Sequence, residues 1–320
     1  MGSGLRPGDV VEVLPAAEIL ATLDADACTD GLPFMPEMLP FVGRRFTVSA
    51  VASKVCDTMR TGTGNRRLHD TVYLDDLRCD GSAHDGCQAG CLIMWRESWL
   101  RRVGPDAEAA GEADASPAEL ETRSRAATTR EPGVYRCQAT ELTAASEPFP
   151  AGDRGRKYLR EVQVGNVGTG RFLRVLARVV GRKLGRTLGL LKDVPIASPG
   201  PPAAAESLDL QPGDLVRVKS KREIAEFVDE TGHNRGLSFD WEMVPHCGQT
   251  YRVKDRVQRI IDENTGTMIE MKRDCVILEG VACSGDLSEG RWFCPRAIYP
   301  YWREAWLRRV EDGGRPSTEG

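Results

Sequence analysis

Long apolar runs are missing from this sequence of 320 residues. A helix that spans a bilayer needs about 18 to 20 consecutive apolar residues, and no stretch approaches that length. Residues 1–8 are short and polar, and they lack the apolar core of a signal peptide. We therefore expect no transmembrane segment and a cytoplasmic location.

The sequence also lacks the motifs of the common enzyme classes. It contains no nucleophile elbow, no glycine-rich phosphate-binding loop, no dinucleotide fingerprint and no paired-carboxylate motif. These absences argue against the classes that carry such motifs, but they leave a metalloenzyme open. No particular reaction or substrate is predicted.

An internal repeat is the strongest feature that is present. The first copy opens with LRPGDVVEV (5–13) and the second with LQPGDLVRV (210–218). They close with WRESWLRRV (95–103) and WREAWLRRV (302–310), which differ at one position in nine. Between these ends, an offset of 205 positions aligns many glycine and apolar residues. Such self-similarity indicates duplication of one folding unit.

Each copy reads as a small β module. A Pro-Gly-Asp turn precedes alternating valines, which is the pattern of a half-buried strand. Short strands with glycine-rich turns in about a hundred residues indicate a small, partly open barrel. We predict a mainly β protein with short helices: two tandem SH3-like barrels and a helical middle segment. The tryptophan pairs Trp95/Trp99 and Trp302/Trp306 are interpreted as core anchors.

Changes in composition divide the rest of the chain. The predicted organisation is module one (5–103), a flexible and mostly acidic linker (104–133), a basic helical segment (134–194), a Pro/Ala-rich linker (195–209) and module two (210–310).

The basic segment contains a stripe of arginines at helical spacing: Arg171, Arg174, Arg178, Arg182 and Arg186. Three interpretations compete. The helix packs on a barrel with its arginines in water; it docks an acidic macromolecule, such as a carrier protein or a nucleic acid; or it adsorbs to an anionic membrane surface. Aromatic residues that would stack on bases are not interleaved with the arginines, which weakens the nucleic-acid reading.

Ten cysteines in a cytoplasmic chain point to metal binding rather than to disulfides. Module one carries the loop CDGSAHDGCQAGC (79–91), whose candidate ligands are Cys79, His84, Cys87 and Cys91, with Cys56 and Cys137 as additional candidates. Zinc is the first choice of metal, an iron–sulfur cluster on Cys79, Cys87, Cys91 and a fourth cysteine is the second, and buried free thiols are the third.

Module two repeats part of this set. Cys283 aligns with Cys79, and Cys294 corresponds to Cys87, because each lies eight residues before the first tryptophan of its closing motif. Cys247 and Cys275 are further candidate ligands in this copy. The pattern predicts two metal sites that share half of their ligands and are completed differently.

The motifs ILATLD (19–24), GLPFMPEMLP (31–40), RLHDTV (67–72) and CDGSAHDGCQAGC (79–91) resemble an uncharacterised bacterial family associated with specialised-metabolite and polysaccharide gene clusters. MVPHCGQTYRV (243–253) and CPRAIYPYWREAWLRRV (294–310) are similar to its single-module form. The resemblance covers both modules. The family pattern has a cysteine at the place of Val42, where module two has Cys247, so the first site departs from it by one ligand.

These observations together predict a metal-stabilised tandem-barrel accessory protein that binds a partner in a biosynthetic pathway. The alternative is a zinc or iron–sulfur metalloenzyme that acts on a pathway intermediate through the module-one cluster. His84 or His69 would then carry the proton.

Overall fold

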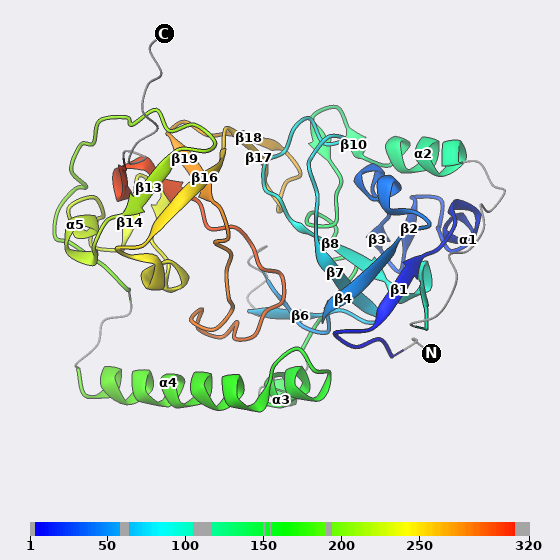
Figure 1. The fold of residues 1–320 in the computed structure, drawn as a ribbon, viewed down its shortest axis with the longest axis horizontal. Helices are drawn as coiled ribbons and strands as arrows, with labels where there is room; N and C mark the ends of the chain where they lie inside the picture. The colour runs from blue at the N-terminus through cyan, green and yellow to red at the C-terminus, as the bar shows by residue number, and fades with distance from the viewer. Residues whose placement is uncertain are drawn as a thin grey trace, which may run out of the picture. The chain divides into compact units, whose positions relative to one another are not determined.

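The computed structural model describes residues 4–57, 64–104, 117–149, 151–153, 155–189 and 194–310. Strands and short helices make up most of the regular structure in these ranges (Figure 1), which confirms the mainly β class. No helix in the described ranges is long and apolar enough to cross a membrane.

Contacts divide the chain into two units. Unit 1 comprises Met1–Arg178, Arg259–Ile269 and Ser284–Ile298, and unit 2 comprises the remainder. These boundaries differ from those of the repeat, because two segments of module two belong to unit 1.

Module one is built on an antiparallel five-stranded sheet in the order β8-β7-β4-β1-β9. Its strands are β1 (Val10–Val13), β4 (Arg45–Val51), β7 (Thr71–Arg78), β8 (Leu92–Arg96) and β9 (Leu100–Arg102). The alternating valines of β1 place Val11 and Val13 in the core, where both are fully buried. One 3-10 turn, η2 (Glu97–Trp99), joins β8 to β9, so the last strand returns to pair with the first.

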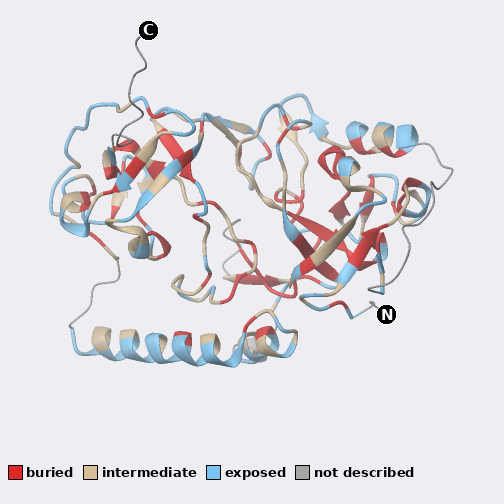
Figure 2. Ribbon diagram, viewed as in Figure 1, coloured by how far each residue is buried: buried red, intermediate tan, exposed pale blue. Residues whose placement is uncertain are grey.

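Module two repeats this sheet in the equivalent order β20-β19-β16-β13-β21. Its strands are β13 (Leu215–Val218), β16 (Thr250–Arg256), β19 (Cys275–Leu278), β20 (Trp302–Arg303) and β21 (Leu307–Arg309), and η5 (Glu304–Trp306) precedes the last. All four tryptophans of the closing motifs are fully buried, as expected of core anchors. Buried residues gather on the strands of both sheets (Figure 2).

Short helices and strands lie between the sheet strands of both modules. Those in the range of module one are α1 (Ala16–Leu20), β2 (Cys28–Thr29), β3 (Leu32–Pro33), η1 (Pro36–Phe41), β5 (Val55–Cys56) and β6 (Asn65–Arg67). Those in the range of module two are α5 (Lys221–Ala225), β14 (His233–Asn234), β15 (Leu237–Ser238), η4 (Trp241–His246), β17 (Arg259–Ile261) and β18 (Met268–Glu270).

The segment between the modules contains α2 (Pro117–Ala126), β10 (Thr129–Glu131), β11 (Val134–Tyr135), β12 (Glu147–Pro148), η3 (Ala151–Asp153), α3 (Arg156–Gln163) and α4 (Thr169–Thr187). Helix α2 falls within the range predicted as a flexible linker, and it inserts the fully buried Leu120 into the core of unit 1. Residues 105–116 of that range lie outside the described residues.

Candidate metal centre

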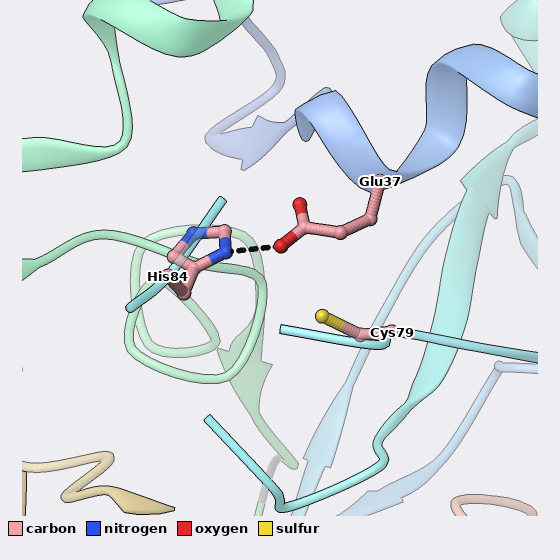
Figure 3. A group of neighbouring side chains, drawn as sticks. All are labelled: Glu37, Cys79 and His84. Atoms are coloured by element: carbon pink, nitrogen blue, oxygen red, sulfur yellow. Dashed lines mark hydrogen bonds and ion pairs between the residues drawn. The ribbon is translucent and has the colours of Figure 1, made fainter. Parts of the chain in front are cut away.

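Three potential metal ligands converge in unit 1. Glu37 lies in η1, Cys79 directly follows β7, and His84 lies in the loop that connects β7 to β8 (Figure 3). One ligand atom of each residue lies within 4.8 Å of the other two. Carboxylate oxygen, thiolate sulfur and imidazole nitrogen are the three donor types that zinc accepts in proteins.

Backbone hydrogen bonds within the loop from Cys79 to Cys91 stabilise its conformation. The amide of Cys79 donates to the carbonyl of Cys91 at 2.9 Å, and the Gly81 carbonyl accepts hydrogen bonds from the amides of His84 and Gly86. Gly81 has φ +71°, and a Cβ there would lie 2.1 Å from the Cys87 carbonyl oxygen. Only glycine fits this position, so the tight turn that presents His84 depends on it.

Both ring nitrogens of His84 have a hydrogen-bond partner. Its Nε2 lies 3.0 Å from the carbonyl oxygen of Arg136, which can only accept, so Nε2 is the donor. The other ring nitrogen, Nδ1, lies 2.6 Å from Oε1 of Glu37. A backbone carbonyl that orients the second ring nitrogen is the usual support of a metal-bound histidine.

The charges of Glu37 and His84 stabilise each other. Burial raises the pKa of Glu37, but the hydrogen bond and charge of His84 outweigh it, and the pKa is lowered. Burial lowers the pKa of His84, but the hydrogen bond and charge of Glu37 raise it above its ordinary value. These directions favour the ion pair, in which Nδ1 of His84 donates to Oε1 of Glu37, and a metal ion bound by both groups would displace this proton.

The second carboxylate oxygen of Glu37 lacks a partner. Oε1 also accepts from the amide of Ala83 at 3.1 Å, whereas Oε2 is buried and has no hydrogen bond to any described residue. A buried carboxylate oxygen without a partner is costly, and a cation would satisfy it. The donor set thus fits a metal ion.

A cavity of about 50 Å³ adjoins two of the three ligands, Cys79 and His84. One water needs about 10–15 Å³ of such space, so the cavity has room for an ion or a few waters. It is lined by the four cysteines Cys79, Cys87, Cys91 and Cys137, by His84, and mainly by apolar side chains that include Met35, Met94 and Ile261.

Burial keeps several of these thiols protonated. It raises the pKa of Cys79 far above its ordinary value, that of Cys91 to about 12 and that of Cys137 to about 11. A thiophilic ion would displace these protons, because thiolates are the form that binds metal.

The structure therefore brings five of the predicted ligands together around one cavity: Cys79, His84, Cys87, Cys91 and Cys137. Cys56 lies elsewhere in unit 1, where its amide donates to the sulfur of Cys294 at 3.0 Å. Cys294 is thus next to a cysteine of module one. His69, the other predicted proton carrier, is exposed, pairs with Glu147 and does not line the cavity.

The remaining module-two cysteines do not converge. Cys275 is buried on β19, Cys247 follows η4, and Cys283 is half-buried. Within the described ranges, none of them belongs to a group of three convergent ligands. The second predicted metal site stays a prediction.

Glu37 was not among the ligands predicted from sequence. The sequence does mark this residue, because Glu37 is the one charged residue in the apolar stretch GLPFMPEMLP (31–40). In the structure Glu37 is only 5% exposed. A buried acid in an apolar segment needs a partner, which marks it as a candidate ligand.

The predicted arginine stripe has two different environments. Arg171 pairs with Asp286 at 2.8 Å, Arg182 lies 3.6 Å over the ring of Trp241, and Arg186 is half-buried. Arg174 and Arg178 are exposed. Part of the stripe therefore serves the fold of the protein itself.

Comparison with models of protein families, with characterised proteins and with solved structures gives no match.

Proposed function

We propose that this chain is a metal-binding protein whose unit 1 holds one ion, zinc by preference, through Glu37, Cys79 and His84. The observation that carries the proposal is the convergence of these three donors, together with the buried and unpartnered Oε2 of Glu37. Zinc accepts a mixed oxygen, sulfur and nitrogen set, and its structural sites usually have four ligands in a tetrahedral arrangement.

One of the cavity thiols completes the site as a fourth ligand. Cys87, Cys91 and Cys137 all line the cavity beside Cys79 and His84, which makes them the candidates for this position. A closed four-ligand site stabilises a fold, since the free energy of metal binding adds to that of folding.

The role that we assign is that of an accessory protein with two SH3-like modules, which binds an acidic partner such as a carrier protein in a bacterial biosynthetic pathway. In both modules the last strand pairs with the first after a single 3-10 turn, which supports a small barrel closed by its terminal strands. The exposed Arg174 and Arg178 supply positive charge for such a partner.

A metalloenzyme is the second candidate, and one observation favours it. If none of the three remaining thiols bound the ion, Glu37, Cys79 and His84 would hold it alone, beside a cavity that Cys79 and His84 line. Three protein ligands and one exchangeable position are the arrangement of catalytic zinc. The four cysteines around the cavity would equally suit an iron–sulfur cluster.

Metal analysis and an absorption spectrum of protein purified without oxygen test these proposals. We expect one equivalent of zinc and no visible absorption, whereas a cluster would give a brown protein with iron and sulfide. Glu37→Gln should lower the bound zinc, and Cys275→Ser, which alters a buried thiol on β19, should not. A wild-type protein free of metal under these conditions would overturn the proposal.

A further inference from the structure

Cys56 and Cys294 form a buried pair that the metal centre does not use. Cys56 ends β5, and Cys294 lies in the segment Ser284–Ile298, which belongs to the same unit. They are 238 positions apart, yet the amide of Cys56 donates to the sulfur of Cys294 at 3.0 Å, and the two thiols hydrogen-bond each other. Both residues are less than a tenth exposed.

The surroundings of Cys294 favour a thiolate. Its sulfur accepts from the backbone amides of Cys56 and Arg296, and the charges of Lys54 and Arg296 act on it. Lys54 is held in place by a 2.6 Å hydrogen bond to the Trp292 carbonyl, and Arg296 by a 3.2 Å hydrogen bond to the carbonyl of Cys56. Two amide donors and two cations around one sulfur are the kind of site that activates a cysteine.

These contacts set Cys294 apart from the other buried thiols. Burial raises the pKa of Cys294, but the hydrogen bond from Cys56 and the two cations outweigh it and lower the pKa to about 7. Burial raises the pKa of Cys275 to about 12 and that of Cys28 to about 11. A thiol whose pKa lies near ambient pH combines a large thiolate fraction with good nucleophilicity.

We propose that Cys56 and Cys294 are a peroxide-reactive dithiol that closes to a disulfide, with Cys294 as the attacking and Cys56 as the resolving cysteine. The Cys294 thiolate attacks one peroxide oxygen and breaks the O–O bond, which gives a sulfenic acid and a hydroxide that takes up a proton to become water. Cys56 sulfur then attacks the sulfenic sulfur, the S–S bond forms, and the departing hydroxide leaves as water with the Cys56 proton. Two electrons pass from the dithiol to hydrogen peroxide, which becomes two waters.

The product would connect β5 of module one to a segment of module two within unit 1. A cross-link over so many residues constrains the unfolded chain strongly, so oxidation should raise the melting temperature of unit 1. This inference is independent of the proposed metal function, because it uses neither Glu37, Cys79 nor His84.

The test treats the full-length, reduced protein with one equivalent of hydrogen peroxide, blocks remaining thiols with an alkylating agent and maps the peptides by mass without reduction. We expect one cross-linked species that contains Cys56 and Cys294 and has lost two hydrogen atoms. Because this experiment uses the wild-type protein, it does not depend on the folding of a variant.

Variants assign the two roles. Cys56→Ser should accumulate a sulfenic acid on Cys294 that dimedone traps, and Cys294→Ser should slow the oxidation of Cys56 roughly tenfold or more. Cys275→Ser is the matched control, since it alters a buried thiol with a raised pKa, and it should oxidise like the wild type. The proposal is overturned if Cys56 and Cys294 stay alkylatable while other cysteines are consumed, or if Cys275→Ser slows the reaction as much as Cys294→Ser.

Discussion

The two modules keep the same aromatic core. In module one the rings of Phe34 and Trp99 meet edge to face, with 5.4 Å between centroids and 85° between planes. In module two Phe239 and Trp306 meet at 5.3 Å and 90°. The sheets around them have the same strand order. Packing in the core was therefore preserved after duplication, as expected where small volume changes are costly.

The modules differ in the loop between their third and fourth strands. In module one residues 79–91 form a compact turn with a histidine and three cysteines. The corresponding part of module two is longer, has no histidine, and its segment Ser284–Ile298 belongs to unit 1. The candidate metal ligands of module one are thus concentrated in a loop, where the chain could change without disturbing the core.

Cys79→Ser and Cys283→Ser test this difference most strongly. Cys79→Ser should remove the bound metal and destabilise unit 1 by several kcal/mol, because zinc binding is worth about 10–16 kcal/mol in zinc-finger peptides. Cys283→Ser should keep the metal. Metal content and melting curves are the measurements, and an equal loss of metal from both variants would contradict the assignment of the ion to the module-one ligands.

Gly81→Ala and Gly285→Ala test the loops themselves. Both glycines have a positive φ, and an added Cβ would lie 2.1 Å from the Cys87 carbonyl oxygen or 2.7 Å from the Cys294 amide nitrogen. Strain of about 1–2 kcal/mol and overpacking of about 1–3 kcal/mol predict a loss of about 2–5 kcal/mol, with the larger loss at Gly81.

Gly43→Ala is the control for this pair in chemical denaturation. Gly43 has φ +71°, but nothing lies within 4 Å of the added Cβ, so only the strain of about 1–2 kcal/mol should appear. If all three variants lose the same free energy of unfolding, the close backbone contacts in the loops do not matter.

Trp99→Phe and Trp306→Phe compare the cores. The indole nitrogen of Trp99 lies 3.0 Å from the hydroxyls of both Thr22 and Thr29, whereas that of Trp306 is buried with no partner in the described chain. Both variants lose packing, but only the first loses hydrogen bonds. Urea unfolding should show about 1 kcal/mol more destabilisation for Trp99→Phe, and equal costs would contradict the difference.

The smallest expected effect concerns pH. His246 contacts Trp302 and Tyr251, where module one has Phe41 against Trp95 and Phe46. Burial lowers the pKa of His246 below its ordinary value of 6.5. The unfolded chain then takes up a proton before the folded chain does, so this contribution to stability is present above pH 6.5 and is lost as the pH falls below it.

The double variant His246→Phe/Tyr251→Phe copies the module-one residues and should abolish this acid-side loss. The ring is partly exposed, so solvent screening limits the effect to less than about 1 kcal/mol. Melting curves of unit 2 between acidic and neutral pH measure it, and a wild type without the acid-side loss would contradict the assignment to His246.

The sequence was most informative where the determinants are local. Alternating valines and near-identical module ends predicted the two β modules, and the short loop from Cys79 to Cys91 forces its ligands to lie near one another. Glu37 reaches Cys79 and His84, and Cys137 reaches the adjoining cavity, each from a distant part of the chain. The pairing of Cys56 with Cys294 joins the two copies of the repeat. Such long-range contacts depend on packing that no local pattern records.

The completion of unit 1 by two segments of module two has a consequence for synthesis on the ribosome. Unit 1 includes Ser284–Ile298, so its N-terminal part emerges well before the chain that completes it. At about 5–20 residues per second, the delay after Arg178 is on the order of 10 s. During this interval Cys56, which is buried in the folded unit, lacks its contact with Cys294, and the incomplete unit exposes surface of the kind that chaperones bind.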